Sequence, residues 1–152
     1  MTPEEKFQLE EMRRHDARRK ATDALWKEAQ NHLGEITALG RNQAWEKAVA
    51  ELELIKHRAD YVSKWIDQPT PAQQDPIKYG GSLLIDMLEF IINNDYGEIV
   101  IFPMEVDGIK FFYVRVSQSS NFRAGRWEDA VVKGFLWSVV VRKVREQVAQ
   151  IQ

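Results

Sequence analysis

Apolar residues recur at heptad spacing over residues 42–66, which predicts an amphipathic helix. The residues that repeat in this way are Trp45, Ala48, Leu52, Ile55, Ala59, Val62 and Ile66. Successive members are three or four residues apart, so they share one side of a helix and form a seam that packs against another helix. Asn42 is a suitable N-cap for this helix.

A longer and more polar helix is predicted before it, over residues 3–38, with a thin apolar stripe. Thr2 and Glu5 have the spacing of a capping box at its start, and Gly40 ends it. Because only a few residues separate the two helices, we expect an antiparallel helical hairpin over residues 1–67.

Residues 68–77 contain three prolines and have the composition of a linker. A strongly apolar helix is predicted after this linker, over residues 82–94. The linker therefore separates the helical hairpin from a second part of the chain, residues 78–152.

The clearest local signal is a β-hairpin formed by residues 98–106 and 109–116, two strand-like runs joined by an Asp-Gly dipeptide. This dipeptide is typical of a two-residue type I′ turn, which fixes the register. Val106 then pairs with Ile109, and the pairing continues along both strands.

Pro103 occupies a position of this register whose backbone N–H points away from the partner strand. The outer side of the first strand is therefore expected to be a sheet edge, and any further strand should pair with residues 109–116. Both faces of the hairpin are apolar. We expect the helices at 82–94 and 126–150 to cover one face, and the helical hairpin, a second copy or a target protein to cover the other.

Residues 117–125 have the composition of a loop, and residues 126–150 are predicted to form one long helix, although a Val-Val-Val run in its middle also suits a strand. The predicted fold class is α+β and mostly helical. It consists of an N-terminal antiparallel helical hairpin and an α-β-β-α unit with a two-stranded antiparallel hairpin, either as two units or as one continuous domain.

Composition excludes several kinds of site. The 152-residue chain contains no cysteine, so it has no disulfide, thiolate metal site or cysteine nucleophile. Its net charge is −2, so the chain as a whole has no electrostatic attraction for nucleic acid or for a membrane surface. No apolar run reaches the roughly 18 residues of a membrane span, and the N-terminus lacks the apolar core of a secretory leader. We therefore expect a cytoplasmic protein that does not bind membranes.

Catalytic motifs are absent from the sequence. His15, His32 and His57 do not have a metal-ligand spacing and are expected on helix surfaces. Asp86 and Glu89 lie one turn apart and can perform acid–base chemistry, but they are expected to form the solvated edge of their helix. We expect no catalytic residue, no metal and no cofactor.

A basic cluster lies in the first helix, where five of the eight residues from 13 to 20 are Arg or Lys. Its members are Arg13, Arg14, Arg18, Arg19 and Lys20. The cluster can follow a phosphate backbone. Alternatively, it pairs with neighbouring carboxylates at helical spacing and forms an ordinary solvated face.

The predicted loop at 117–126 is a second possible phosphate site, because it leads into a helix N-terminus with free N–H groups. The candidate anion-binding residues are Ser119, Ser120, Asn121, Arg123 and Arg126. Two arginines offer bidentate donors, and Phe122 can stack on a base. An ordinary connector explains the same composition.

These features favour a non-enzymatic protein–protein interaction module, an adaptor or inhibitor that self-associates or binds a protein target. Its expected interaction surface consists of Trp45, Leu52, Ile55, Phe102, Phe111, Phe112 and Tyr113. The alternative is a nucleic-acid or nucleotide-phosphate binding protein that uses the loop at 117–126 and the basic face of the first helix.

Overall fold

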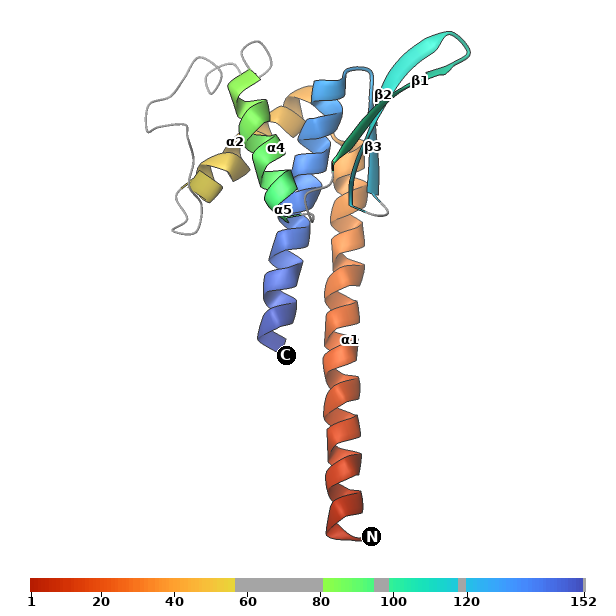
Figure 1. Cartoon of the computed structure of the whole chain (residues 1–152), viewed down its shortest axis with the longest axis vertical. Helices are drawn as coiled ribbons and strands as arrows, with labels where there is room; N and C mark the ends of the chain where they lie inside the picture. Colours follow the sequence, from red (N-terminus) through yellow and green to blue (C-terminus); the bar gives the residue numbers. More distant parts are fainter. Residues whose placement is uncertain (57–80, 95–98, 118–119, 152) are drawn as a thin grey trace.

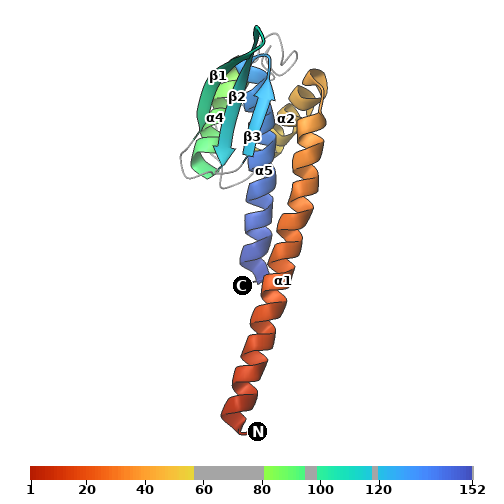
Figure 2. The same cartoon turned by 90° about the vertical axis from the view of Figure 1, so that its right-hand side faces the viewer.

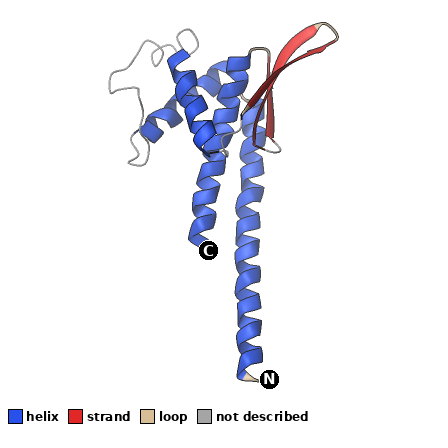
Figure 3. Ribbon diagram, viewed as in Figure 1, coloured by secondary structure: helices blue, strands red, loops and turns tan. Residues whose placement is uncertain are grey.

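The computed structural model describes residues 1–56, 81–94, 99–117 and 120–151 (Figure 1). Its elements are α1 (Pro3–Ala38), α2 (Arg41–Lys56), α4 (Gly81–Asn94), β1 (Val100–Val106), β2 (Ile109–Ser117), β3 (Ser120–Ala124) and α5 (Trp127–Ile151). Helices dominate, and the strands form one antiparallel sheet (Figure 3). The predicted α+β, mostly helical class is confirmed.

Some predicted features lie outside the described residues. They are the end of the second helix with Ala59, Val62 and Ile66, the linker at 68–77, His57, and Ser119.

Helix α5 is the centre of the fold, because α1, α2, α4, β2 and β3 all pack against it. The predicted long helix is confirmed, including the Val-Val-Val run. Most residues from Ala130 to Val144 are buried in a core to which every one of these neighbours contributes. Helix α4 joins this core through an edge-to-face contact in which the ring centroids of Phe90 and Phe135 are 5.3 Å apart.

Helix α1 begins and ends where the sequence predicts. The Glu5 amide donates to the Thr2 hydroxyl at 3.2 Å and the Thr2 amide donates to the Glu5 carboxylate at 3.1 Å, so the capping box is present. Gly40 does not adopt the left-handed conformation of a C-cap glycine. Instead its carbonyl accepts the first hydrogen bond of α2, from the amide of Ala44 at 2.9 Å. Helix α2 therefore begins at Arg41, and Asn42 is not its N-cap.

The apolar seam of α2 is buried, with Trp45, Ala48, Leu52 and Ile55 all in the core. The seam packs on α5, and α1 and α2 contact each other much less than each contacts α5. A polar link fixes this packing, since Asp129 of α5 accepts hydrogen bonds from Trp45 Nε1 at 2.8 Å and from Arg41 Nε at 3.1 Å.

The strand order of the sheet is β1-β2-β3, and the predicted register of β1 with β2 is confirmed from Val106–Ile109 to Val100–Arg115. Asp107 and Gly108 both have positive φ, as the type I′ turn requires. The third strand, β3, pairs with β2, so β1 is an edge among the described strands. The prediction made from Pro103 is therefore also confirmed.

The prediction of a loop at 117–126 is wrong for its central part, because Ser120–Ala124 form strand β3. Its serines and asparagine are typical of loops, and they obscured a short alternation. Phe122 and Ala124 pair in register with Val114 and Phe112 and so face the helices, whereas Asn121 and Arg123 face away.

The sheet packs on α5 through one face only, which we call the inner face. Val114, Val116 and Phe122 on this face are fully buried. Gly134 of α5 allows the close approach, because a Cβ at this position would overlap Cγ2 of Val116 and lie 3.5 Å from Cγ1 of Val114. Helix α4 packs chiefly on α5 and less on the sheet.

Candidate functional site

The opposite face of the sheet, the outer face, has no helix over it in Figure 2. The register assigns to it the side chains at alternate positions of the three strands, namely Val100, Phe102, Met104, Val106, Ile109, Phe111, Tyr113, Arg115, Asn121 and Arg123. None of these residues is acidic. The described part of the outer face is thus an apolar and aromatic surface with two cations.

The centre of the outer face is a cluster of aromatic rings. The ring centroid of Tyr113 is 5.4 Å from that of Phe102 and 5.5 Å from that of Phe111. The Arg123 guanidinium lies over the Phe111 ring, with Cζ 4.2 Å from the centroid. These distances are typical of aromatic pairs and cation–π contacts. Phe111 is only 5% exposed, whereas Phe102 and Tyr113 are half-buried and remain accessible.

The end of the β1-β2 hairpin continues this surface. Val106 and Ile109 pair directly and are 52% and 65% exposed, and Met104 beside them is 40% exposed. Figure 1 shows the hairpin end projecting beyond the helices, so both of its faces are open there. Ile101 of the inner face is also exposed. Adjacent exposed aliphatic side chains that continue an aromatic cluster are characteristic of an interaction surface.

The predicted interaction residues fall into two groups. Trp45, Leu52 and Ile55 are core residues of this chain and are not exposed to a partner in this structure. Phe102, Phe111 and Tyr113 are gathered on the outer face. Phe112 is half-buried and belongs to the inner face of β2.

The predicted anion-binding residues are also divided. Asn121 and Arg123 are exposed and lie on the outer face, beside the aromatic cluster. Ser120 begins β3, so its backbone belongs to a strand rather than to a helix N-terminus. Arg126 is exposed directly before α5, and its carbonyl accepts from the amide of Ala130. The structure therefore brings Arg123 together with the predicted aromatic surface, an arrangement that neither sequence motif predicts by itself.

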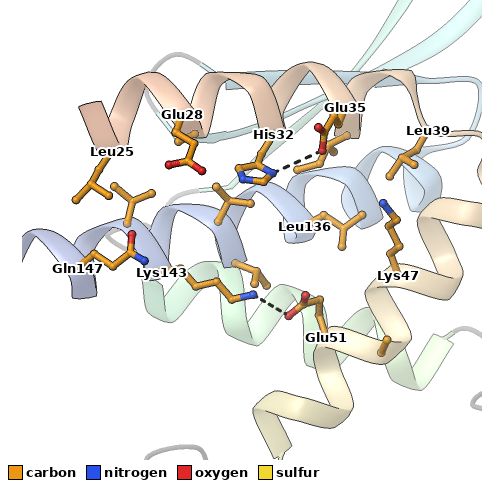
Figure 4. Close-up of a pocket in the computed structure, with 16 residues that line it drawn as sticks. Leu25, Glu28, His32, Glu35, Leu39, Lys47, Glu51, Leu136, Lys143 and Gln147 are labelled. Atoms are coloured by element: carbon orange, nitrogen blue, oxygen red, sulfur yellow. Dashed lines mark ion pairs between the residues drawn. The ribbon is translucent and has the colours of Figure 1, made fainter. Parts of the chain in front are cut away.

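A groove of about 490 Å³ lies between α1, α2 and α5 (Figure 4). Its floor is aliphatic, with Ala29 and Ile36 of α1 beside Leu136 and Val144 of α5. All four are buried, whereas Leu25, Leu39 and Val140, which also line the groove, are half-buried.

Ionisable side chains line the groove, and two pairs of them are in contact. Lys143 Nζ is 3.5 Å from a carboxylate oxygen of Glu51, and His32 Nδ1 is 3.6 Å from a carboxylate oxygen of Glu35 (Figure 4). The described residues contain no group of three His, Asp or Glu side chains that could hold a metal ion.

The basic cluster of α1 lies far from the sheet in Figures 1 and 2. It is partly paired, because Arg14 contacts Glu11 at 3.4 Å and Arg19 contacts Asp16 at 3.8 Å. The two parts of the alternative phosphate surface are thus not one continuous site. His15 and His32 are exposed on their helix, as predicted.

Asp86 differs from its prediction. It is fully buried in α4 rather than part of a solvated edge, and Glu89 is half-buried. Asp86 belongs to the face of α4 that also carries Leu83, Met87 and Phe90 in the core. Its spacing, three residues after Leu83 and four before Phe90, places it on this face, so the helical periodicity indicated burial and the charged residue type concealed it.

Comparison with known proteins identifies no relative, because no family model, no curated protein and no solved structure matches the chain. No helix in the described part of the chain is long and apolar enough to cross a membrane.

Proposed function

We propose that the chain is a non-enzymatic protein-interaction module, an adaptor or inhibitor, and that its partner protein docks on the outer face of the sheet. The observation that carries the proposal is the continuous run of aromatic and aliphatic side chains from Tyr113 to Ile109, with no helix over it. Such a surface in water costs free energy that a partner removes by covering it.

The chemistry of the outer face indicates what the partner offers. Aliphatic side chains at the hairpin end can pack against an apolar side chain of the partner. Tyr113 supplies a rigid aromatic contact with a polar hydroxyl. Arg123 lies over the Phe111 ring at the centre of the face, and none of the outward-facing residues of the described strands is acidic. A partner with apolar residues followed by a carboxylate therefore complements the face in both hydrophobicity and charge.

Site-specific photocrosslinking in the native host tests this proposal. A photoreactive phenylalanine analogue replaces Met104 on the outer face and, in a matched control, Gln30, which is exposed on α1. We expect a discrete protein adduct at Met104, resistant to nuclease and absent at Gln30. Equal adducts at the two positions, or none at Met104, would contradict the proposal. The expected cytoplasmic location remains a prediction that the same preparation checks by fractionation.

One observation favours a second candidate, binding of single-stranded nucleic acid. Arg123 lies over the Phe111 ring, and Phe111 meets Tyr113 edge to face, so a cation and aromatic rings are grouped on an open sheet; such groups bind bases and phosphates in many single-strand binding proteins. This candidate predicts binding to random-sequence RNA or DNA that weakens steeply as salt is raised.

The arginines test this candidate directly. Arg123→Ala combined with Arg126→Ala should abolish nucleic-acid affinity without changing the fold. Lys27→Ala combined with Lys47→Ala removes the same charge from exposed positions of α1 and α2 and should leave binding intact. Identical isotherms for the parent and the arginine variant would remove this surface from consideration.

A further inference from the structure

The N-terminal part of α1 projects alone beyond the end of α5 in Figures 1 and 2. We call residues 3–21 the α1 arm. Its side chains are exposed except for Leu9 and Glu11, which are half-exposed, and the first buried residue of α1 is Ala29. Most helix stability in proteins comes from tertiary packing, so a second surface that packs on the arm would stabilise it.

Charge is distributed unevenly along the arm. Residues 4–11 contain four acidic side chains and one basic one, whereas residues 13–20 contain five basic side chains and one acidic one. Two arms placed side by side in opposite directions would bring the acidic half of each against the basic half of the other. A parallel arrangement would instead place like charges together.

One stripe of the arm provides the contact positions. Its members alternate in steps of three and four residues and are Glu4, Phe7, Glu11, Arg14, Arg18 and Ala21. This spacing places them on one side of the helix, where they act as the a and d positions of a coiled coil. Phe7 is 64% exposed and is available as an apolar contact.

We propose that two copies of this chain associate through their α1 arms in antiparallel orientation. The stripe fixes the register, because pairing a with d positions sets Glu11 opposite Arg14 of the second copy and Phe7 opposite Arg18 of the second copy. Each pairing occurs twice by symmetry. Arg14 already lies 3.4 Å from Glu11 of its own chain, so the four side chains at the centre form one charge network.

The inference is independent of the proposed function, because the arm and the outer face of the sheet are far apart in Figure 1. A dimer joined at the arms carries two outer faces at opposite ends. The stripe contains four charged residues, so the association is expected to be modest and sensitive to salt, and its orientation is specified by charge rather than by apolar area.

Light scattering after size exclusion tests association of the full chain. The parent should show twice the mass of the chain, and Arg14→Glu with Arg18→Glu should be a monomer, as should Glu4→Arg with Glu11→Arg. An equimolar mixture of the two variants should recover the dimer mass. Arg13→Glu with Lys20→Glu changes charge equally on the opposite side of the arm and should remain dimeric. A monomeric parent, or a dimer that survives Arg14→Glu with Arg18→Glu, would overturn the proposal.

Disulfide trapping tests the orientation, and the absence of native cysteine leaves no competing thiol. Glu4→Cys mixed with Ala21→Cys should give a mixed disulfide, because these positions face each other in the antiparallel register. Ala21→Cys alone should give none, since its two copies would lie about 25 Å apart along the arms. Efficient crosslinking of Ala21→Cys to itself would show a parallel pair and refute the register.

Discussion

The inner and outer faces of the three-stranded sheet have similarly apolar sequences but different surroundings. On the inner face, Val114, Val116 and Phe122 are fully buried under α5. On the outer face, Val106 and Ile109 remain more than half exposed, and the aromatic cluster has no helix over it. The two faces of β2 therefore differ in what they contact rather than in how apolar they are.

Apolar alternation thus defines the register of a sheet but not the element that covers each of its faces. The inner face fits α5 because Gly134 lets the helix approach Val116 closely. In the described part of the chain no helix packs on the outer face in this way. The outer face instead carries the side chains of Arg115 and Arg123. Substitutions that are chemically equal on the two faces should thus have unequal effects on stability.

The largest effect is expected from a charge on the inner face. Val114→Asp buries a carboxylate without a partner and should lower the free energy of unfolding by roughly 4 kcal/mol or more. Val106→Asp makes the same change where the side chain is 52% exposed, and should cost no more than about 1 kcal/mol. Chemical denaturation of both variants measures the difference. Equal destabilisation would mean that the two faces are not distinct.

Two leucines of α2 that are two residues apart in the sequence also differ in burial. Leu52 is 1% exposed and faces α5, whereas Leu54 is 63% exposed. Leu52→Asp should destabilise the fold by roughly 3–5 kcal/mol, because a charge enters the core beside Trp45. Leu54→Asp should stay within about 0.5 kcal/mol of the parent. If melting of the Leu52 variant coincided with the parent, the packing of the seam on α5 would be refuted.

Alanine substitutions at two helical glycines should change the free energy of unfolding least, and the two changes should have opposite signs. Gly134→Ala places a methyl group where it overlaps Cγ2 of Val116. It should therefore lower the free energy of unfolding by about 1–3 kcal/mol, despite the better helix propensity of alanine. Gly34→Ala, on an open part of α1, should stabilise by up to about 1 kcal/mol. Thermal unfolding resolves both, at about 2–4 °C for each kcal/mol. A stabilised Gly134 variant would argue against the close approach of α5 to β2.

Local signals predicted much of the fold. The capping box at Thr2, the Asp-Gly turn and the position of Pro103 are each determined by chemistry within a few residues, and all three are present. The extent of α5 was also predictable, because no turn-forming residue interrupts it apart from Gly134, which stays helical.

Properties that depend on distant partners were not predictable. The seam of α2 indicates that a helix packs on it, but not that this helix is α5 rather than α1. Strand β3 was missed because its stability comes from pairing with β2, which outweighs its loop-like composition. Phe102, Phe111 and Tyr113 were identified from the hairpin register, but the addition of Arg123 to their face required knowledge of β3.

The most direct test of the central claim, that the outer face of the sheet is the docking surface, combines photocrosslinking with thermal unfolding in one variant. The photoreactive analogue at Met104 is compared with and without Tyr113→Glu, which changes the centre of the outer face but not the core. Tyr113→Glu should shift Tm by no more than a few degrees and abolish the protein adduct. An adduct that persists at the parent yield in a folded Tyr113→Glu chain would contradict it.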